Sequence, residues 1–291
     1  MLYRSFQKLT FLSVWSHPLV IEFLNSWKYL FYYVFGRTRV HGVLVKKQLL
    51  ITHEILRFIV TGEYEKDEVT LLKDNLTNED RLIEFGSGIG VTSIFAQKKM
   101  GLHGQILSFD GNDKAIRAAQ ANAVMNDCRE IEYRHGAVTS ADKASLAFRQ
   151  DSHFWASNLA PNHAQGTTAI PAFKMNRILA NFRPTCGIMD IEGGEYELLA
   201  AEAWQSCPSL KWLIVEFHKT SSSVKNPDDE NELIEKLTHL AKYWQFPTHV
   251  SELARSIQIN PTSVILCPKS IVTCIDTCLL YTSDAADDRV S

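Results

Sequence analysis

An apolar segment that runs into three closely spaced glycines constrains the fold of this chain most strongly. Residues 81–85 form a short apolar run that contains Glu84, and the turn Gly86-Ser87-Gly88-Ile89-Gly90 follows. Glycine lets the backbone turn sharply and lets a ligand approach without a Cβ clash. Residues 91–99 have helical character, and a helix that begins there presents free N–H groups to an anion. The pattern predicts a strand, a ligand-binding turn and a helix.

Strand-like and helix-like segments alternate beyond this turn. The expected strands are 105–109, 131–133, 186–191, 212–217 and 263–267, and the expected helices are 113–125, 195–204 and 230–243. Such alternation is typical of a mostly parallel sheet covered by helices on both faces. Residues 139–170 interrupt the alternation, and a long segment without periodicity is usually functional or disordered. We therefore predict an α/β, Rossmann-like domain over residues 41–268.

The composition limits the classes of function. The chain has 291 residues, 45% of them hydrophobic, so it can bury a sizeable core. Its net charge of −3 argues against an electrostatic grip on nucleic acid, which needs a basic surface. The six cysteines contain no CxxC pair, and we expect Cys128, Cys186 and Cys207 to be buried, reduced thiols. Together with the lack of a convincing signal peptide, this usage predicts a cytoplasmic protein.

Residues 1–40 are expected to form a helical extension. Apolar residues repeat at helical spacing over 19–35, but polar residues interrupt the run, which is short for a membrane span. One hypothesis is a helix packed on the main domain. The other is a helix that lies in a membrane interface with Trp27, Tyr29, Tyr32 and Tyr33 near the headgroups, which would make the protein membrane-peripheral.

The last residues, 269–291, are expected to be a tail. From about Cys278 the sequence resembles the translated read-through of a transposon adapter used in DNA sequencing libraries. We expect that part not to belong to the natural protein and exclude it from the prediction of the fold.

Polar residues gather at the carboxyl ends of the expected strands. Besides Glu84, they are Asp110, the segment Asp190-Ile191-Glu192-Gly193-Gly194-Glu195, and the segment Glu216-Phe217-His218. Ligands of an open parallel sheet bind outside these strand ends. We therefore expect the acidic strand ends to converge on one ligand site.

The nature of the cofactor follows from the residues around the glycine turn. Asp110, 20 residues beyond Gly90, can accept hydrogen bonds from both ribose hydroxyls of an adenosine. The NAD pattern G-x-G-x-x-G fails, because Val91 stands in place of the third glycine. Glu84 would be a poor neighbour for a diphosphate but suits a cofactor that carries an ammonium and a sulfonium. The prediction is S-adenosylmethionine, bound by Gly86, Ser87, Gly88 and Gly90, with Ala137 flanking the adenine.

The motifs, taken in order, resemble the FkbM family of methyltransferases. They are Gly62-x-Tyr64-Glu65, Glu84-x-Gly86-x-Gly88-x-Gly90, Phe109-Asp110, Asp190-Ile191-Glu192-Gly193-x-Glu195 and Ile214-Val215-Glu216-x-His218. The resemblance covers roughly residues 40–267 and implies a class I methyltransferase fold with a seven-stranded sheet. Tyr64 and Glu65 precede this sheet and could close over the cofactor or begin a surface helix. The chain departs from the family's usual aspartate at Glu84, from its alanine-asparagine pair at Ser87 and Ile89, and from its acidic-proline pair at Asp110-Gly111.

The resemblance also implies methyl transfer to an oxygen, commonly a hydroxyl on a sugar, glycolipid or secondary metabolite. A general base would remove the hydroxyl proton, and the candidates are Asp190, Glu192, Glu195, Glu216 and His218. The imidazole of His218 suits this role because it ordinarily titrates near neutrality. Glu192 and Glu195 could instead hold acceptor hydroxyls, or Glu195 could cap a helix. A divalent metal on Asp190, Glu192 and Glu195 is disfavoured, because no histidine is near them in sequence.

Other functions stay open. An N-methyltransferase acting on a small amine would have the same cofactor half, and so would a non-catalytic cofactor-binding module. A nicotinamide-dependent oxidoreductase is disfavoured by the failed glycine pattern. The expected partner is a small-molecule or glycan acceptor and not nucleic acid, and His153, Trp155 and His163 could belong to a lid over that acceptor.

Overall fold

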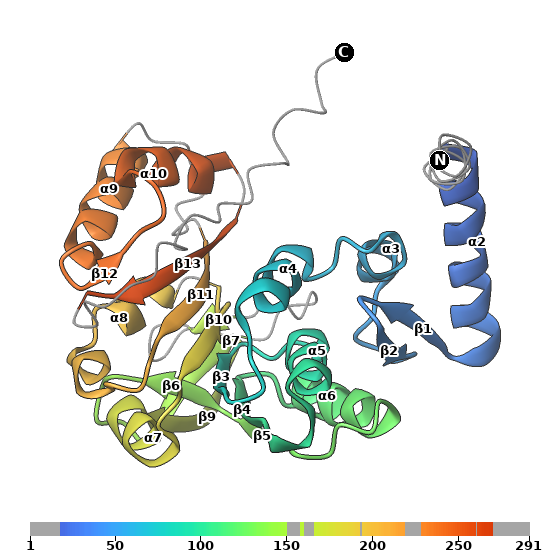
Figure 1. Ribbon diagram of the computed structural model, residues 1–291, viewed down its shortest axis with the longest axis horizontal. Helices are drawn as coiled ribbons and strands as arrows, with labels where there is room; N and C mark the ends of the chain where they lie inside the picture. Colours follow the sequence, from blue (N-terminus) through green and yellow to red (C-terminus); the bar gives the residue numbers. More distant parts are fainter. Residues whose placement is uncertain are drawn as a thin grey trace, which may run out of the picture.

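The computed structural model describes residues 18–149, 158–159, 166–192, 194–218, 228–259 and 261–269. A seven-stranded sheet with the order β12-β13-β11-β10-β3-β4-β5 lies at its centre (Figure 1). The strands are β3 (Arg81–Phe85), β4 (Gln105–Asp110), β5 (Ile131–His135), β10 (Cys186–Met189), β11 (Trp212–Phe217), β12 (Trp244–Gln245) and β13 (Thr262–Pro268).

Five of these strands are parallel neighbours, and β13 runs antiparallel to both β11 and β12. The strand order reverses between β3 and β10, since the chain first adds β4 and β5 on one side of β3 and later adds β10 and β11 on the other. A ligand crevice forms at such a reversal, outside the carboxyl ends of the strands. The sheet and its covering helices confirm the predicted class I methyltransferase fold.

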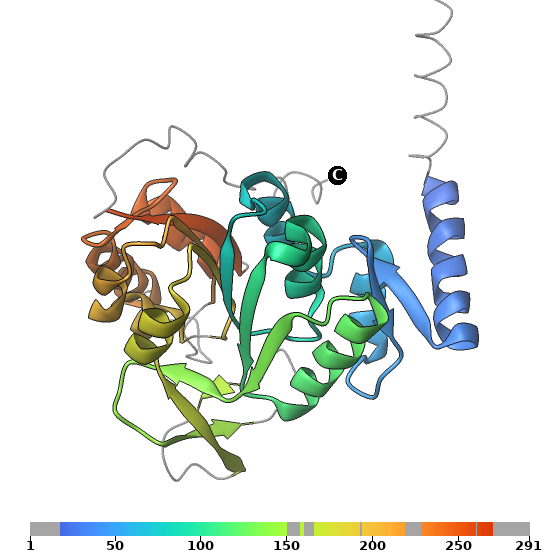
Figure 2. The same ribbon diagram turned by 60° about the horizontal axis from the view of Figure 1, so that its bottom comes forward.

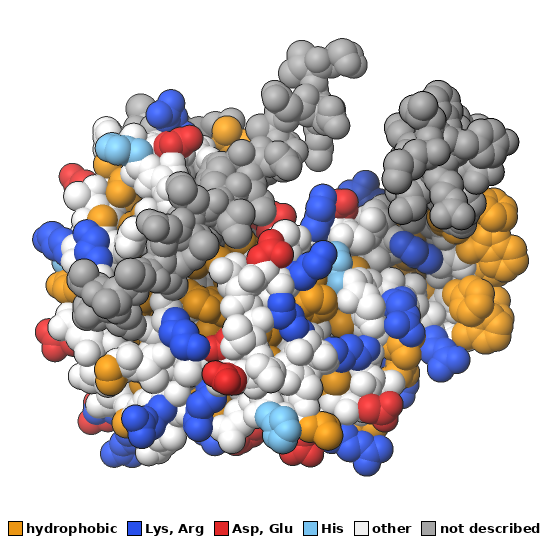
Figure 3. Space-filling model, viewed as in Figure 1, with side chains coloured by type: hydrophobic (Ala, Val, Ile, Leu, Met, Phe, Trp, Pro, Cys, Tyr) orange, Lys and Arg blue, Asp and Glu red, His pale blue; other side chains and the backbone are white. Residues whose placement is uncertain are grey.

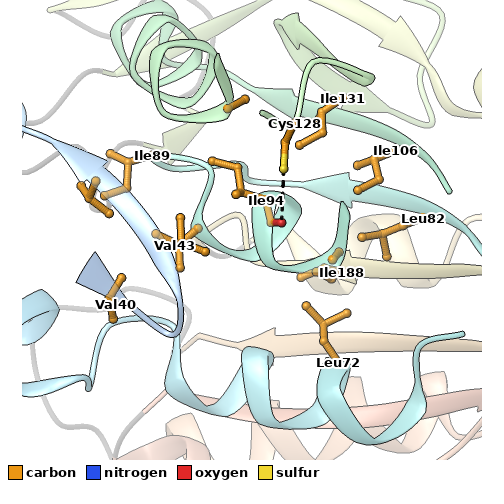
Figure 4. Close-up of a cluster of buried hydrophobic side chains, with 14 of the residues drawn as sticks. Val40, Val43, Leu72, Leu82, Ile89, Ile94, Ile106, Cys128, Ile131 and Ile188 are labelled. Carbon is orange, nitrogen blue, oxygen red and sulfur yellow. Dashed lines mark hydrogen bonds between the residues drawn. The ribbon is translucent and has the colours of Figure 1, made fainter. Parts of the chain in front are cut away.

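Helices cover both faces of the sheet. On one face lie α3 (His53–Thr61), α4 (Lys66–Asn75), α5 (Val91–Met100) and α6 (Asp113–Met125); on the other lie α7 (Met175–Phe182), α8 (Glu195–Leu199), α9 (Asp228–Leu240) and α10 (Val250–Ile259). Successive side chains of a strand point to opposite faces, so Leu82 belongs to the first core and Ile83 to the second. Figure 4 shows the first core, where Leu72 of α4, Ile94 of α5 and Ile106 of β4 lie around Leu82.

A second, four-stranded sheet occupies much of the segment that lacks periodicity. Its order is β6-β9-β7-β8, from β6 (Ala137–Thr139), β7 (Ser145–Arg149), β8 (Asn158–Leu159) and β9 (Thr167–Lys174). In Figure 2 these strands, drawn in light to yellowish green, lie below the central sheet. The expectation of an irregular segment over 139–170 was wrong for 145–149, 158–159 and 167–170. The burial of β7 and β9 does not alternate regularly, so the period-2 signal of a strand is weak.

The N-terminal part is a helix followed by a hairpin. Helix α2 spans Pro18–Phe35, and β1 (Arg37–Val40) pairs antiparallel with β2 (Val43–Lys46). The expectation that residues 37–40 end a helical segment was wrong. His41 and Gly42 adopt positive φ angles of 46° and 80°, which make a tight turn and return the chain as a second strand. Among the described helices, none combines the length and apolarity that crossing a membrane would require.

Several predicted elements are confirmed at or near their bounds, and others are not. Strands β3, β4 and β11 and helix α6 lie where the sequence predicts them. The helix expected over 195–204 stops at Leu199, and a separate 3₁₀ turn spans Glu202–Ser206. Helices α7 and α10 and strand β12 were not predicted. Cys128, Cys186 and Cys207 are buried and free, as expected, whereas residues 1–17 and the proposed artefact from 278 lie outside the described residues.

Candidate functional site

The glycine turn brings the ends of β3 and β10 together at the reversal point of the sheet. Gly86 has a φ of 92°, and a Cβ added to it would lie 1.7 Å from the carbonyl oxygen of Asp190. The Asp190 N–H in turn donates to the Phe85 carbonyl at 2.9 Å. Only glycine permits both this φ and this approach, so the turn and the first residue after β10 form one rigid unit.

Asp110 ties the glycine turn to the end of β4. Its carboxylate accepts hydrogen bonds from the Gly88 N–H at 2.9 Å and the Asn112 N–H at 2.7 Å. Burial raises the pKa of Asp110 to about 6, even though these backbone bonds favour its charged form. Each carboxylate oxygen still has a further lone pair for a ligand hydroxyl. Ala137 follows Gly136, whose N–H donates to the Asp110 carbonyl at 2.8 Å, so Ala137 lies beside this strand end.

Gly111, the residue after Asp110, lies against an aromatic side chain of the second sheet. A Cβ on Gly111 would lie 2.5 Å from Cε2 of Phe148, a residue of β7. The four-stranded sheet therefore occupies the space that a proline at position 111 would need. This accounts physically for the departure from the acidic-proline pair.

Glu84 lies fully buried beneath the glycine turn. The hydroxyl of Thr92, in the first turn of α5, donates to one carboxylate oxygen of Glu84, and the hydroxyl of Ser108, in β4, donates to the other. Burial nevertheless raises the pKa of Glu84 to about 7. The sequence predicts Glu84 as a cofactor contact, and the structure places it as a fully buried carboxyl group behind the turn.

Two more carboxylates lie at the start of α4. Glu65 precedes the helix with a φ of 54°, and burial together with the charges of Glu68 and Asp190 raises its pKa well above the usual value. Glu68 is buried and accepts a hydrogen bond from the Ser263 hydroxyl, and burial raises its pKa to about 7. Sequence reasoning missed Glu68, because an acidic residue in a charged helix looks like a solvent-facing one. Its only sequence signal is a position one helical turn after Glu65.

The side chain of His218 lies among acidic residues at the ends of β10 and β11. Its Nδ1 lies 2.9 Å from Oε1 of Glu195, which also accepts the Ile191 N–H at 3.2 Å. Its Nε2 lies 3.5 Å from Asp190, 3.6 Å from Glu192 and 3.9 Å from Glu216. The strand ends thus converge as the sequence predicts, with Glu195 fully buried and Glu192 about 30% exposed.

The protonation of His218 differs from the expectation. Burial alone would lower its pKa, but the bond to Glu195 and the charges of Asp190 and Glu192 outweigh burial and raise the pKa to about 9. His218 is therefore an imidazolium at neutral pH in the free protein. The expectation that His218 could act as a base without a large pKa shift was therefore wrong, because Glu195, Asp190 and Glu192 raise its pKa.

The carboxylates keep their protons more tightly than usual, each chiefly because it is buried. The pKa of Glu192 rises to about 7, and those of Asp190 and Glu216 also rise. Within the described part of the chain, the ion pairs of these carboxylates all involve His218. Such a site favours a bound cation, which would relieve the mutual repulsion of the acidic groups.

A metal ion is one cation that this site could hold. Asp190, Glu216 and His218 each offer a ligand atom, and these atoms lie within 4.8 Å of one another. The argument against a metal, that no histidine lies near Asp190 in sequence, therefore fails in three dimensions. His218 is distant in sequence yet adjacent in space.

The first turn of α5 offers the complementary charge. Gly90 caps this helix without a side-chain hydrogen bond, and no acidic residue occupies its first turn. The acidic group that contacts this first turn is Glu84, through the hydroxyl of Thr92, and the positive end of the helix dipole lies at the glycine turn. The Ser87 hydroxyl beside it is buried and has no hydrogen-bond partner among the described residues.

Some predicted site residues lie outside the described residues. They are Gly193 in the Asp190–Glu195 segment and the expected lid residues His153, Trp155 and His163. Tyr64, expected to close over the cofactor, is held through its backbone, because its carbonyl oxygen lies 2.7 Å from Nε2 of His41.

Comparisons with known proteins give likenesses of structure only. No protein-family model matches the chain, and no curated protein matches it. TYW2 from M. jannaschii, solved in complex with AdoMet, has a TM-score of 0.40 and 12% identity, covering 72% of this chain and 73% of that chain. Precorrin-6y C5,15-methyltransferase from Geobacter metallireducens GS-15 has a TM-score of 0.36 and 16% identity, covering 62% and 71%.

A third similar structure is much longer than the matched region. TrmN from Thermus thermophilus has a TM-score of 0.32 and 14% identity, covering 51% of this chain, and the chain spans 37% of TrmN. At such identities a likeness concerns the fold alone. The strand order of the central sheet, and not these likenesses, defines the fold described above.

Proposed function

We propose that this chain is an S-adenosylmethionine-dependent methyltransferase, and that its acceptor is a hydroxyl group of a small molecule or glycan. The observation that carries the proposal is the set of buried carboxylates at the reversal point of the sheet, directly beside the glycine turn. Burial raises the pKa values of Glu84 and Glu192 to about 7 and that of Asp110 to about 6. A cofactor with two positive groups would relieve this charge, whereas a dinucleotide would add negative charge.

The residues at the strand ends fit the parts of this cofactor. Asp110 at the end of β4 has lone pairs for the ribose hydroxyls, and Ala137 lies beside the same strand end. The uncapped start of α5 suits the methionine carboxylate. The acidic groups near Asp190 and Glu65 suit the ammonium and sulfonium charges.

When bound, S-adenosylmethionine supplies an activated methyl group and leaves as a neutral thioether. The side chains of the protein would orient the acceptor and take its proton. Glu192 is the proposed base, because it is partly exposed and its pKa of about 7 makes it a stronger base than an ordinary glutamate. Glu195 is fully buried and would position the imidazolium of His218, which lies 3.6 Å from Glu192.

A hydroxyl acceptor agrees with the charge of the site. Asp190, Glu192 and Glu216, which lie around His218, would face the acceptor, and those that are ionised would repel the phosphates of a nucleic acid, which supports a neutral small molecule or glycan. The preference for a sugar, glycolipid or secondary metabolite rests on the resemblance to the FkbM family. An N-methyltransferase would share every cofactor contact and differ only in the acceptor.

Cofactor binding can be tested by calorimetry and thermal unfolding. We expect S-adenosylmethionine and S-adenosylhomocysteine to raise the unfolding temperature, and NAD to leave it unchanged. Asp110→Asn should weaken binding by about 10- to 100-fold, because it removes a charged hydrogen-bond acceptor. The matched control is Asp113→Asn, on the surface of α6 where Asp113 pairs with Arg117. Equal stabilisation by NAD, or equal effects of the two variants, would refute the proposal.

A further inference from the structure

Helix α2 presents an unusually large apolar face to solvent. Eight of its side chains are exposed by 38–62%, namely Phe23, Leu24, Trp27, Leu30, Phe31, Tyr33, Val34 and Phe35. Figure 3 shows part of this face as the large orange group at the right-hand edge, over the position of α2 in Figure 1. Contiguous exposed apolar surface of this kind marks an interaction site. We call these eight residues the α2 face.

The opposite side of the helix already packs on the domain. Tyr32 is buried, the ring of Tyr29 stacks on His53 with centroids 6.0 Å apart, and the Lys28 ammonium donates to the Val60 carbonyl at 2.6 Å. These contacts fix α2 against α3 and the β1–β2 hairpin. The expectation that Tyr29 and Tyr32 lie near the headgroups was therefore wrong, because both pack on the domain. The α2 face is the part of the helix that this packing leaves exposed, so the two hypotheses for the helix do not exclude each other.

Basic residues lie at the carboxyl end of the α2 face. Residues 1–53 contain seven Lys and Arg and one Glu, whereas the whole chain has 30 basic and 33 acidic residues. Arg37 and Arg39 are exposed on β1, immediately after the helix. The Lys47 ammonium lies 5.0 Å from the ring centroid of Tyr33, at the carboxyl end of the face. A cationic border thus adjoins an aromatic, apolar surface.

We propose that the α2 face docks on the surface of an anionic lipid bilayer. A helix with one apolar, aromatic-rich side and nearby basic residues lies in the plane of the interface, and its aromatic rings enter the boundary between headgroups and acyl chains. Arg37, Arg39 and Lys47 would then face the acidic headgroups. The proposal does not depend on methyl transfer.

Flotation of the full chain with lipid vesicles tests the proposal. We expect the protein to float with vesicles of phosphatidylcholine and phosphatidylserine, to bind pure phosphatidylcholine vesicles at least about tenfold more weakly, and to lose binding as salt is added. The double variant Trp27→Glu and Phe31→Glu should lose binding. The matched control is Leu102→Glu with Ile259→Glu, which changes two exposed apolar residues elsewhere.

Charge can be tested separately from the apolar face. Arg37→Gln with Arg39→Gln should weaken binding to the anionic vesicles by at least about tenfold and leave binding to neutral vesicles unchanged. Failure of the unmodified protein to float would overturn the proposal without any variant. Equal flotation of the Trp27 and Phe31 variant would overturn it as well. A dimer in sedimentation that this variant dissociates, without vesicle binding, would assign the face to a second copy.

Discussion

Replacing Glu84 by glutamine tests whether the site holds buried carboxylates that resist ionisation. Burial raises the pKa of Glu84 from its ordinary value of 4.5 to about 7, although Thr92 and Ser108 donate hydroxyl hydrogen bonds to it. Below pH 4.5 the carboxyl group is protonated in both the folded and the unfolded chain. Between pH 4.5 and 7 the unfolded chain releases this proton and the folded chain keeps it. The free energy of unfolding therefore falls as the pH rises through this window.

The size of this effect follows from the two pKa values. A difference of about 2.5 pH units, at about 1.36 kcal/mol per unit, corresponds to roughly 3 kcal/mol lost between pH 4.5 and pH 8. Glu84→Gln has no proton to lose. Between pH 5 and pH 8, the free energy of unfolding of the unmodified protein should therefore fall by about 2–3 kcal/mol more than that of the variant. The substitution also changes the hydrogen bonds of residue 84. This changes the free energy of unfolding of the variant by the same amount at every pH, so the difference in pH dependence remains.

Urea unfolding at a series of pH values measures the effect. The matched control is Asp80→Asn. Burial would raise the pKa of Asp80, but hydrogen bonds from Thr185 and Thr77 outweigh burial and lower it. A lowered pKa contributes stability that is lost only as the pH falls towards and below 3.8, so Asp80→Asn should cost the same at pH 5 and pH 8. Parallel curves for Glu84→Gln and the unmodified protein would refute the reasoning.

Three further outcomes are expected. Glu192→Gln should lower kcat by about 10²- to 10⁴-fold without changing the Kd for S-adenosylmethionine. The control Glu197→Gln, on the exposed side of α8, should leave kcat unchanged, and equal kcat values for the two variants would exclude Glu192 as the base. In urea unfolding, Gly86→Ala should destabilise the protein by at least about 2 kcal/mol more than Gly62→Ala, because both glycines have a positive φ but only a Cβ at position 86 clashes with Asp190. Equal losses of stability in the two variants would contradict the close approach of Gly86 to Asp190. A chelator should leave methyl transfer unchanged, and loss of activity restored by magnesium would assign the acidic groups to a metal.

Local signals predict the elements that immediately frame the site. Strand β3, the glycine turn and helix α6 carry their own patterns of apolar spacing and turn residues, so their positions follow from the sequence. The strand ends also converge as predicted, because the carboxyl ends of parallel strands must lie along one edge. Asp110 and Asp190 are therefore found by position alone.

Features that depend on the tertiary environment were not predictable in this way. Glu68 looks like a surface residue of a charged helix until α4 is placed against Ser263 of β13. The raised pKa of His218 depends on Glu195, Asp190 and Glu192, which are distant from it in sequence. Likewise, the hydrophobic spacing of α2 indicates a helix but cannot say that its apolar side points to solvent.

Transfer of a labelled methyl group tests the central claim most directly. The protein would be incubated with cell extract and S-adenosylmethionine that carries a deuterated methyl group, and the products analysed by mass spectrometry. We predict a product in which the labelled methyl group is bonded to an oxygen, with the yield strongly reduced in Asp110→Asn and Glu192→Gln. A protein that binds the cofactor but yields no labelled product would contradict the account, and a label on nitrogen would contradict the proposed hydroxyl acceptor.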